Sequence, residues 1–532
     1  MAKQIPAVVN LAFPNGRKLD VPTGLFIDNK FVPSVEGATI DSINPVTEEL
    51  LATVSSATEQ DIDIAVASSR NAFKTVWGRN FPPVQRGKLL NRLADLLERD
   101  AEAFAGLEAL DNGKSAQVAR EVDLPDSIAC IRYYAGWADK IFGQTIEVDD
   151  KGLKSASTRV EPFGVCAQII PWNYNIMMLA WKIGPALAAG CTVILKPSEL
   201  TPLPALKFSE LVAEAGFPPG VFNCVPSYGP IGGAALASHL NVDKVAFTGS
   251  TLTGRKIMQA AALSNLKKVT LELGGKSPHI IFESANLKDA ATHVTGGIFL
   301  NQGQDCSAGS RLYVQASVYD AFLKELKASA EEWTAGYGDN FKEGALGGPL
   351  VSKAQRDKVV NYVEGAKEAG ASILYGGTKW EGKGWYYLPT IIGDVTPDMK
   401  VVKEEVRLII ILFIHHRYSD DLRSSFVGVK IFGPVLVVSK FNTEEEVIEL
   451  ANNTTYGLGA GFHSSDANQC QRVQASLEAG TVWVNQYGLL YNQSPFGGYK
   501  QSGIGRELGS YAIDNYTQIK TVLWDYSGGS SQ

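Results

Sequence analysis

The sequence predicts an α/β protein built around a parallel sheet, and three observations support this. Between Val165 and Leu273, short runs rich in β-branched residues alternate with longer segments of helical character, which is typical of β-α-β crossover units. Leucines recur at helical spacing in residues 86–100, so we expect an amphipathic helix that packs on a core. The chain has 532 residues, enough for about two to four domains.

Five strands are expected in the alternating region, in the order GVCAQII (164–170), TVILK (192–196), VFNCV (221–225), KVAFT (244–248) and KKVTLEL (267–273). Ligands of such sheets bind beyond the carboxyl ends of the strands. Four of the five strands lead there into polar or glycine-rich segments, namely PWNYN (171–175), KPSE (196–199), FTGST (247–251) and ELGGK (272–276). We therefore expect a binding site along this edge of the sheet.

Composition excludes several classes of function. Asp and Glu number 56 against 49 Lys and Arg, a net charge of −7, so there is no positive field to attract nucleic acid or anionic lipid. No apolar run is long enough to span a membrane, and no signal-peptide pattern is present. The six cysteines are scattered without CxxC pairs, which favours reduced thiols and a cytoplasmic protein. The six histidines lack ligand spacing, so no metal site is expected.

The signals for nucleotide binding are weak when each is taken alone. Gly249 and Gly254 stand at a strand-to-helix junction, but the Lys-Ser/Thr pair of a phosphate-binding loop is missing, and SYGPIGG (227–233) lacks the GxGxxG spacing. Both a phosphate contact at a helix start and an ordinary turn remain open. Lys196 and Glu199 are open in the same way, because they suit either ribose hydroxyls or solvated surface charges.

Cys306 differs from the other cysteines in its surroundings. Small polar residues flank it in NQGQDCSAGSR (301–311), which leaves room for a substrate at an exposed thiol. Most of the other cysteines lie in apolar runs such as GVCAQII, where a buried, inert thiol is expected. Glu272 precedes Cys306 at the end of an apolar strand, a setting that raises a carboxyl pKa and suits a general base. The residues alone favour neither a thiol-plus-base pair nor separate structural roles decisively.

Seven segments together resemble the aldehyde dehydrogenase superfamily, in the order in which that family has them. They are PWNYN, KPSE, FTGST, ELGGKSP, NQGQDCSAGSR, KEE followed later by FGP, and SPFGGYKQSGIGRELG. The resemblance covers Gly24 to Asp525 and is closest to the NAD(P)-linked enzymes that oxidise a broad range of aldehydes.

The resemblance implies an aldehyde dehydrogenase-like α/β fold with three parts. Residues 1–143 and 163–274 form a modified doubly wound NAD-binding domain, and residues 275–505 form an α/β catalytic domain. Residues 144–162 and 506–532 form a small β oligomerisation arm and tail. The implied assembly is a homo-oligomer, a dimer of dimers.

The resemblance also assigns the catalytic roles. Cys306 is the nucleophile that attacks the aldehyde, and Asn173 completes an oxyanion hole with the Cys306 N–H. Hydride leaves for NAD as a thioester forms on the cysteine. Glu272 activates the water that hydrolyses the thioester to a carboxylic acid.

The implied contacts to the cofactor and substrate extend along the same edge. Those to the cofactor are Ile169, Pro171, Trp172, Lys196, Glu199, Gly229, Gly249, Ser250, Leu273, Gln355, Glu405 and Phe432. The carboxylate of Glu199 would repel a 2′-phosphate, so NAD is favoured over NADP. Tyr174, Met177, Trp181 and Phe496 are implied to line the aldehyde tunnel, with core packing as the alternative. Their apolar bulk suits an uncharged small-molecule aldehyde.

The family pattern is interrupted between Glu405 and Ile431. The 25 residues 406–430 separate KEE from IFGP and include an apolar run, LIIILFI, followed by HHRYSDDLRSS without continuing periodicity. Val406 can be encoded by GTN and Lys430 by AAG, so an in-frame unspliced intron would give these boundaries. A genuine regulatory loop is the alternative.

Four functions follow for the chain as a whole. The first is an NAD-dependent aldehyde dehydrogenase of broad specificity, and the second is a specialised semialdehyde or betaine-aldehyde dehydrogenase. The third is a catalytically impaired chain, favoured by the insertion and disfavoured by the intact Cys306, Glu272 and Asn173. The fourth is a thiol hydrolase without a cofactor, which Lys196 and Glu199 disfavour.

Overall fold

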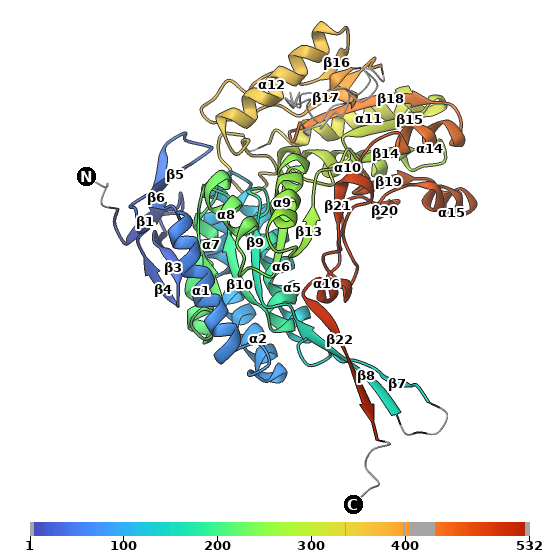
Figure 1. Ribbon diagram of the computed structural model, residues 1–532. Helices are drawn as coiled ribbons and strands as arrows, with labels where there is room; N and C mark the ends of the chain where they lie inside the picture. Colours follow the sequence, from blue (N-terminus) through green and yellow to red (C-terminus); the bar gives the residue numbers. More distant parts are fainter. Residues whose placement is uncertain are drawn as a thin grey trace, which may run out of the picture.

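The computed structural model describes residues 5–149, 152, 154–335, 337–396, 399–403 and 431–526 (Figure 1). The predicted insertion 406–430 and the predicted cofactor contact Glu405 lie outside the described residues. None of the helices in the described part of the chain combines the length and apolar character needed to cross a membrane.

The first sheet has eight strands in the order β21-β13-β12-β9-β10-β11-β3-β4. Its five central strands are β9 (Val165–Ile169), β10 (Thr192–Lys196), β11 (Phe222–Cys224), β12 (Lys244–Thr248) and β13 (Lys268–Glu272). They pair in parallel, which confirms the predicted parallel sheet. At the edges stand β3 (Leu25–Ile27), β4 (Lys30–Val32) and β21 (Gly503–Ile504), joined by antiparallel pairing. The strand order reverses between β9 and β12, where ligands of doubly wound sheets bind.

Helices cover both faces of this sheet because its strands are apolar on both sides. Cys166 and Val193 belong to the core on one face, whereas Val165 and Ile194 belong to the core on the other, as the two-residue period of strands requires. The helices on the first face are α2 (Pro83–Arg99), α5 (Leu124–Ala135), α6 (Asn175–Ala189) and α7 (Leu203–Ala215). Those on the second are α1 (Glu59–Thr75), α8 (Ala234–Ser238) and α9 (Thr251–Leu263).

The leucine-rich segment forms α2, as predicted. Leu90, Leu93 and Leu97 are buried, and Leu89 and Leu96 pack at the margin of the same core. The chain continues through α3 (Ala101–Asp111), α4 (Ala116–Val118) and the π-helical turn η1 (Ala119–Asp123).

A second sheet of seven strands has the order β16-β17-β18-β15-β14-β19-β20. Its strands are β14 (Pro278–Ile281), β15 (Arg311–Gln315), β16 (Ser372–Tyr375), β17 (Thr390–Gly393), β18 (Val435–Phe441), β19 (Gly459–His463) and β20 (Thr481–Val484). All pairs are parallel except that of β16 with β17. Its helices are α10 (Leu287–Phe299), α11 (Tyr319–Glu332), α12 (Lys353–Glu368), α13 (Lys400–Lys403), α14 (Glu444–Asn452) and α15 (Ala467–Ser476).

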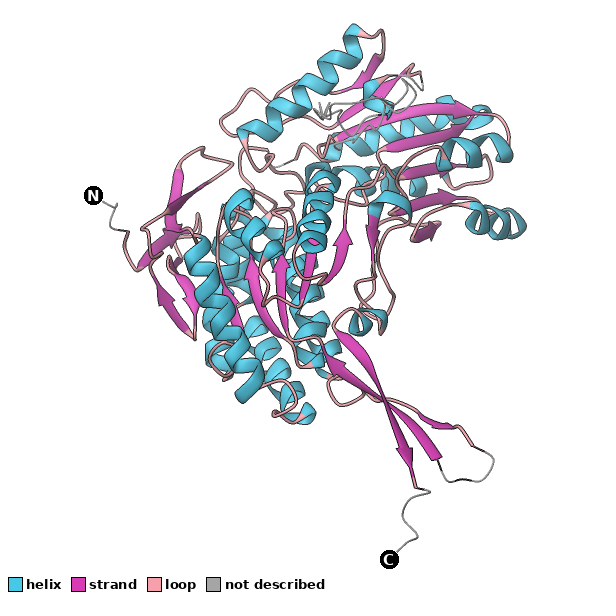
Figure 2. Ribbon diagram, viewed as in Figure 1, coloured by secondary structure: helices cyan, strands magenta, loops and turns pink. Residues whose placement is uncertain are grey.

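A three-stranded sheet extends away from the rest of the molecule (Figures 1 and 2). It consists of β7 (Thr145–Glu147), β8 (Lys154–Pro162) and β22 (Thr517–Asp525), which follows α16 (Tyr511–Asp514). Near the N-terminus lie two hairpins, β1 (Val8–Ala12) with β2 (Lys18–Pro22) and β5 (Thr39–Ile43) with β6 (Leu50–Ser55).

Candidate active site

A cavity of about 660 Å³ lies where the carboxyl ends of the first sheet face loops of the second. Fourteen predicted site residues line it: Pro171, Trp172, Asn173, Tyr174, Met177, Trp181, Gly249, Ser250, Glu272, Leu273, Cys306, Gln355, Phe432 and Phe496. Four others, Ile169, Lys196, Glu199 and Gly229, are not part of this lining. The cavity therefore brings together the predicted nucleophile, base and oxyanion donor.

Cys306 follows a tight turn, η3 (Leu300–Gly303), whose backbone lies in the left-handed region. Asn301 and Gln302 have φ of 49° and 58°, and Gly303 has φ of 68°. A side chain at Gly303 would stand 2.1 Å from the carbonyl oxygen of Gly433, so only glycine allows the two backbones to approach this closely. Cys306 is partly exposed, as predicted, and all six cysteines are free thiols.

Two tyrosines hold the residues on either side of Cys306. Tyr174 donates its hydroxyl to Asp305 Oδ2 at 2.9 Å, and Tyr487 donates its hydroxyl to the Ser307 carbonyl at 2.8 Å. Asp305 Oδ1 also accepts the Ser307 N–H at 2.6 Å. Sequence reasoning singled out neither Asp305 nor Tyr487. The only available signal was that Asp305 is the carboxylate adjacent to the predicted nucleophile.

Asn173 is buried between β9 and α6, and its amide is held by the segment that contains η3 and precedes Cys306. Its Nδ2 donates to the Gln304 carbonyl at 2.8 Å, while Asn301 Nδ2 donates to the Asn173 carbonyl at 2.8 Å. An asparagine amide carries two N–H donors, so the bond to Gln304 leaves one for a ligand.

Glu272 ends β13 as a buried carboxylate, and its Oε2 has no hydrogen-bond partner among the described residues. Burial raises the pKa of Glu272 well above its ordinary value, and the negative charge of Glu507 raises it further. Lys182 and Arg506 oppose this rise. The structure confirms the predicted direction of the pKa shift, and it adds Glu507, whose position in GRELG gave no sign of this contact.

The part of the cavity formed by the predicted substrate residues is aromatic and acidic. Trp181 packs edge-on against Phe496 with ring centroids 5.6 Å apart, and its Nε1 donates to Asp126 Oδ2 at 2.8 Å. Burial raises the pKa of Asp126 to about 6. Glu121 also lines the cavity, so the lining carries acidic groups that the four predicted tunnel residues did not indicate. Tyr174, Met177, Trp181 and Phe496 line the cavity and belong to the hydrophobic core as well, so core packing holds for all four and their role in an aldehyde tunnel stays a prediction.

The predicted cofactor residues offer donors and open space that suit a dinucleotide. Lys196 Nζ and Glu199 Oε2 lie 3.5 Å apart at the end of β10, an ammonium and a carboxylate that can bind ribose hydroxyls. No heavy atom lies within 4 Å of the position that a side chain would take at Gly229. Ser250 caps α9 by accepting the Thr253 N–H at 3.2 Å, beside a helix start suited to phosphate.

Phe432 lines the cavity from a turn that Gln355 holds by hydrogen bonds. The Gln355 amide donates to the carbonyls of Ile431 and Phe432, at 2.7 Å each. Phe432 has φ of 55° and packs edge-on against Trp172 at 5.2 Å. Ile431 and Val401 are buried in one hydrophobic cluster, so the described residues on the two sides of 404–430 share a core.

The comparisons with known proteins agree with this arrangement. The model of the aldehyde dehydrogenase family matches residues 31–422 and 421–522. An aldehyde dehydrogenase of Alternaria alternata is 50% identical over 514 residues, 97% of each chain, and aldehyde dehydrogenase 1A1 of Rattus norvegicus is 46% identical over 96% of each. The NAD+ complex of an aldehyde dehydrogenase from Bacillus cereus has a TM-score of 0.88 at 46% identity, covering 94% of this chain and 96% of that one. The chain belongs to the aldehyde dehydrogenase family.

Proposed function

We propose that this protein oxidises small-molecule aldehydes to carboxylic acids with NAD+, through a covalent intermediate on Cys306. One observation carries the proposal: a partly exposed thiol, a buried carboxylate and a fixed amide donor line one cavity. Family membership supports the same chemistry. When bound, NAD+ accepts the hydride that leaves the substrate carbon.

Cys306 and Asn173 act first. The Cys306 thiolate attacks the carbonyl carbon, and the aldehyde oxygen becomes an oxyanion as the C–S bond forms. The free N–H of the Asn173 amide and the Cys306 backbone N–H stabilise this charge, and such donors are typically worth about 3 kcal/mol each. Loss of hydride then leaves a thioester on Cys306.

Glu272 acts second, in hydrolysis. Its carboxylate takes a proton from water, the resulting hydroxide attacks the thioester carbon, and the Cys306 thiolate leaves. The raised pKa of Glu272 makes it a stronger base than an exposed carboxylate. The unpartnered Oε2 supports this role, because a buried oxygen without a protein donor is suited to bind a water.

We assign NAD binding to the cofactor residues predicted above, with Glu199 favouring NAD over NADP. Ile169, Lys196, Glu199 and Gly229 lie outside the described cavity lining, but Lys196 pairs in register with Ile169 on neighbouring strands. A bound dinucleotide would extend from the cavity along these strand ends. The roles of Glu405 and of the other contacts remain part of the proposal.

We propose the predicted division into an NAD-binding domain, a catalytic domain and an oligomerisation arm, with a dimer of dimers as the assembly. Exposed Ile519, Leu523 and Trp524 on β22 support an intersubunit role for the arm, because apolar groups on an edge strand suit pairing with another chain. We also propose a cytoplasmic location, supported by six free thiols.

The test is the formation of NADH with a panel of aliphatic, aromatic, semialdehyde and betaine-type aldehydes. Cys306→Ala should abolish turnover and leave NAD+ binding nearly intact, because only the thiol forms the covalent bond. Cys470→Ala is the matched control, since Cys470 is also a partly exposed free thiol but does not line the cavity. Retention of more than a few per cent of turnover in Cys306→Ala would contradict the assignment. Ester hydrolysis without any NADH formation would favour the thiol hydrolase instead.

A further inference from the structure

Three charged side chains are buried together behind the active site, where neither the sequence motifs nor the proposed chemistry uses them. They are Glu108 on α3, Lys114 in the following loop and Asp123 on η1, and none is more than 1% exposed. Lys114 Nζ donates to Asp123 Oδ2 and lies 3.8 Å from Glu108 Oε2. Buried ion clusters of this kind often stabilise a fold no better than apolar residues of equal volume, so stability alone does not explain the cluster.

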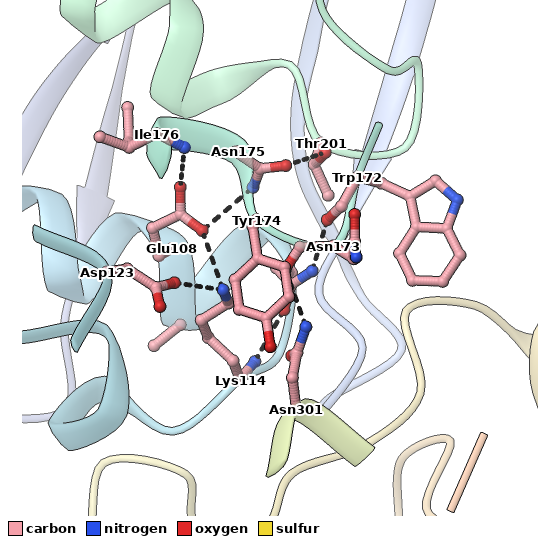
Figure 3. Close-up of polar contacts among 12 residues, drawn as sticks. Glu108, Lys114, Asp123, Trp172, Asn173, Tyr174, Asn175, Ile176, Thr201 and Asn301 are labelled. Atoms are coloured by element: carbon pink, nitrogen blue, oxygen red, sulfur yellow. Dashed lines mark hydrogen bonds and ion pairs between the residues drawn. The ribbon is translucent and has the colours of Figure 1, made fainter. Parts of the chain in front are cut away.

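A first set of contacts connects the cluster with the segment around Cys306. Lys114 Nζ lies 4.4 Å from the centroid of the Tyr174 ring (Figure 3), a cation–π distance that fixes the ring relative to the ammonium. The hydroxyl of this ring donates to Asp305 Oδ2, and Asp305 Oδ1 accepts the Ser307 N–H. The position of Lys114 is thereby coupled to the turn that carries Cys306.

A second set of contacts connects the cluster with the segment around Asn173, the proposed oxyanion donor. Glu108 Oε1 accepts the Ile176 N–H at 3.1 Å and Glu108 Oε2 accepts Asn175 Nδ2 at 3.2 Å (Figure 3). These bonds anchor the start of α6, two residues after Asn173. The carbonyl of Trp172, on the other side of Asn173, is held by Asn112 Nδ2 at 2.6 Å.

We propose that Lys114 is a positioning residue for the oxidation of the aldehyde: through Tyr174 and Glu108 it fixes Cys306 and Asn173 relative to each other. The proposal rests on the proposed function. The covalent step requires the Sγ to reach the carbonyl carbon while the amide faces the oxygen. A displacement near 1 Å at such a site can cost about a hundredfold in rate.

The test uses the full-length protein with Lys114→Met, Tyr174→Phe and the double variant. Each single variant should slow the burst of NADH per active site by about tenfold to a hundredfold, with a smaller change in the KM for aldehyde. If NADH formation becomes slower than hydrolysis, the burst merges with steady-state turnover and a primary isotope effect with deuterated aldehyde appears there, because cleavage of the aldehyde C–H bond then limits the rate. The double variant should be about as slow as Lys114→Met, because loss of Lys114 already removes its contacts with both Tyr174 and Glu108 and loss of the Tyr174 hydroxyl then adds little.

Lys267→Met is the matched control, because Lys267 is another buried lysine, bonded to the Ala237 carbonyl and outside the cavity lining. Its burst rate per active site should be unchanged even if stability falls. If Lys114→Met does not fold, Asp123→Asn replaces it in the cycle, with the same non-additivity expected and a smaller loss.

Two results would overturn the positioning role. One is a normal burst rate per active site in Lys114→Met, with any lost activity following only the amount of folded protein. The other is fully additive losses in the double variant. Inactivity of the unaltered protein toward every aldehyde would contradict the proposed function itself, whereas activity in that protein together with an unaffected Lys114→Met contradicts only the inference.

Discussion

Lys182 and Glu507 form an ion pair beside the active site, and both charges act on Glu272. Lys182 Nζ donates to Glu507 Oε1 and to Thr248 Oγ1, the latter at 2.6 Å. Glu507 raises the pKa of Glu272, whereas Lys182 lowers it. The protonation state of the proposed base therefore depends on this ion pair, of which Glu507 also lines the cavity.

Glu507→Gln should shift the acid limb of the pH–turnover profile to lower pH. Glu272 must be ionised to accept a proton from water, so turnover falls as pH falls through its pKa. Removing the negative charge of Glu507 lowers that pKa, and the released charge of Lys182 lowers it further. Glu444→Gln, which removes an ion-paired glutamate from the surface helix α14, should leave the profile unchanged. A shift toward higher pH in Glu507→Gln would contradict the electrostatic account.

Glu272→Gln should keep the pre-steady-state burst of NADH and slow steady-state turnover by about a hundredfold or more. The burst survives because, in the proposed order of steps, hydride leaves before water attacks the thioester. Stopped-flow absorbance measures both phases in one experiment. Loss of the burst itself would show that Glu272 acts in an earlier step.

Glu199→Gln should narrow the preference for NAD over NADP, because the repulsion of a 2′-phosphate disappears while one hydrogen-bonding oxygen remains. The ratio of kcat/KM with the two cofactors measures the effect. Glu210→Gln is the control, since Glu210 forms an equivalent i,i+3 pair with Lys207 in the neighbouring helix. An unchanged ratio in Glu199→Gln would remove this carboxylate from cofactor selection.

Deleting residues 406–430 should raise both NAD affinity and turnover. The deletion restores the family spacing between Glu405 and Phe432, and Gln355 already holds the turn that carries Phe432. Equilibrium binding of NAD and steady-state rates are compared for the two chains. Equal or better activity in the full-length chain would identify the segment as an accommodated part of the enzyme.

Asp111→Asn should flatten the dependence of stability on pH. Burial raises the pKa of Asp111 from 3.8 to about 8, so the folded state holds a proton that the unfolded state releases. Its stabilising contribution is complete below pH 3.8 and declines as pH rises toward about 8. Unfolding midpoints measured from pH 5 to 8 should fall less steeply in the variant. An identical slope in both proteins would show that Asp111 does not carry this dependence.

The sequence predicted what depends on local pattern and missed what depends on long-range contact. The five parallel strands were predictable because runs such as TVILK are apolar on both faces. The edge strands β3 and β21 were not, because two or three residues carry no periodicity. Cys306 and Glu272 stood out by their surroundings.

The residues that contact or influence Cys306 and Glu272 could not be recognised in the sequence. Lys114 and Tyr174 are sixty residues apart, and neither neighbouring sequence indicates a charge over a ring. Glu507 lies far from Glu272 in the chain, and only folding brings its charge close. Such pairs follow from the tertiary arrangement, which single-residue environments do not encode.

The contact of Gly303 with the Gly433 carbonyl has a consequence for the gene that encodes this chain. Val401 and Ile431 are buried in one hydrophobic cluster, and closing a flexible loop costs only about 0.6 kcal/mol more for each doubling of its length. The residue at position 433 itself cannot change, since a side chain in place of Gly433 would stand 2.4 Å from the side chain of Val359. An error in RNA processing that adds whole codons before the codon of Ile431 leaves Gly433 in place against Gly303. An error that changes the codon of Gly433 or of Gly303 displaces the turn that precedes Cys306.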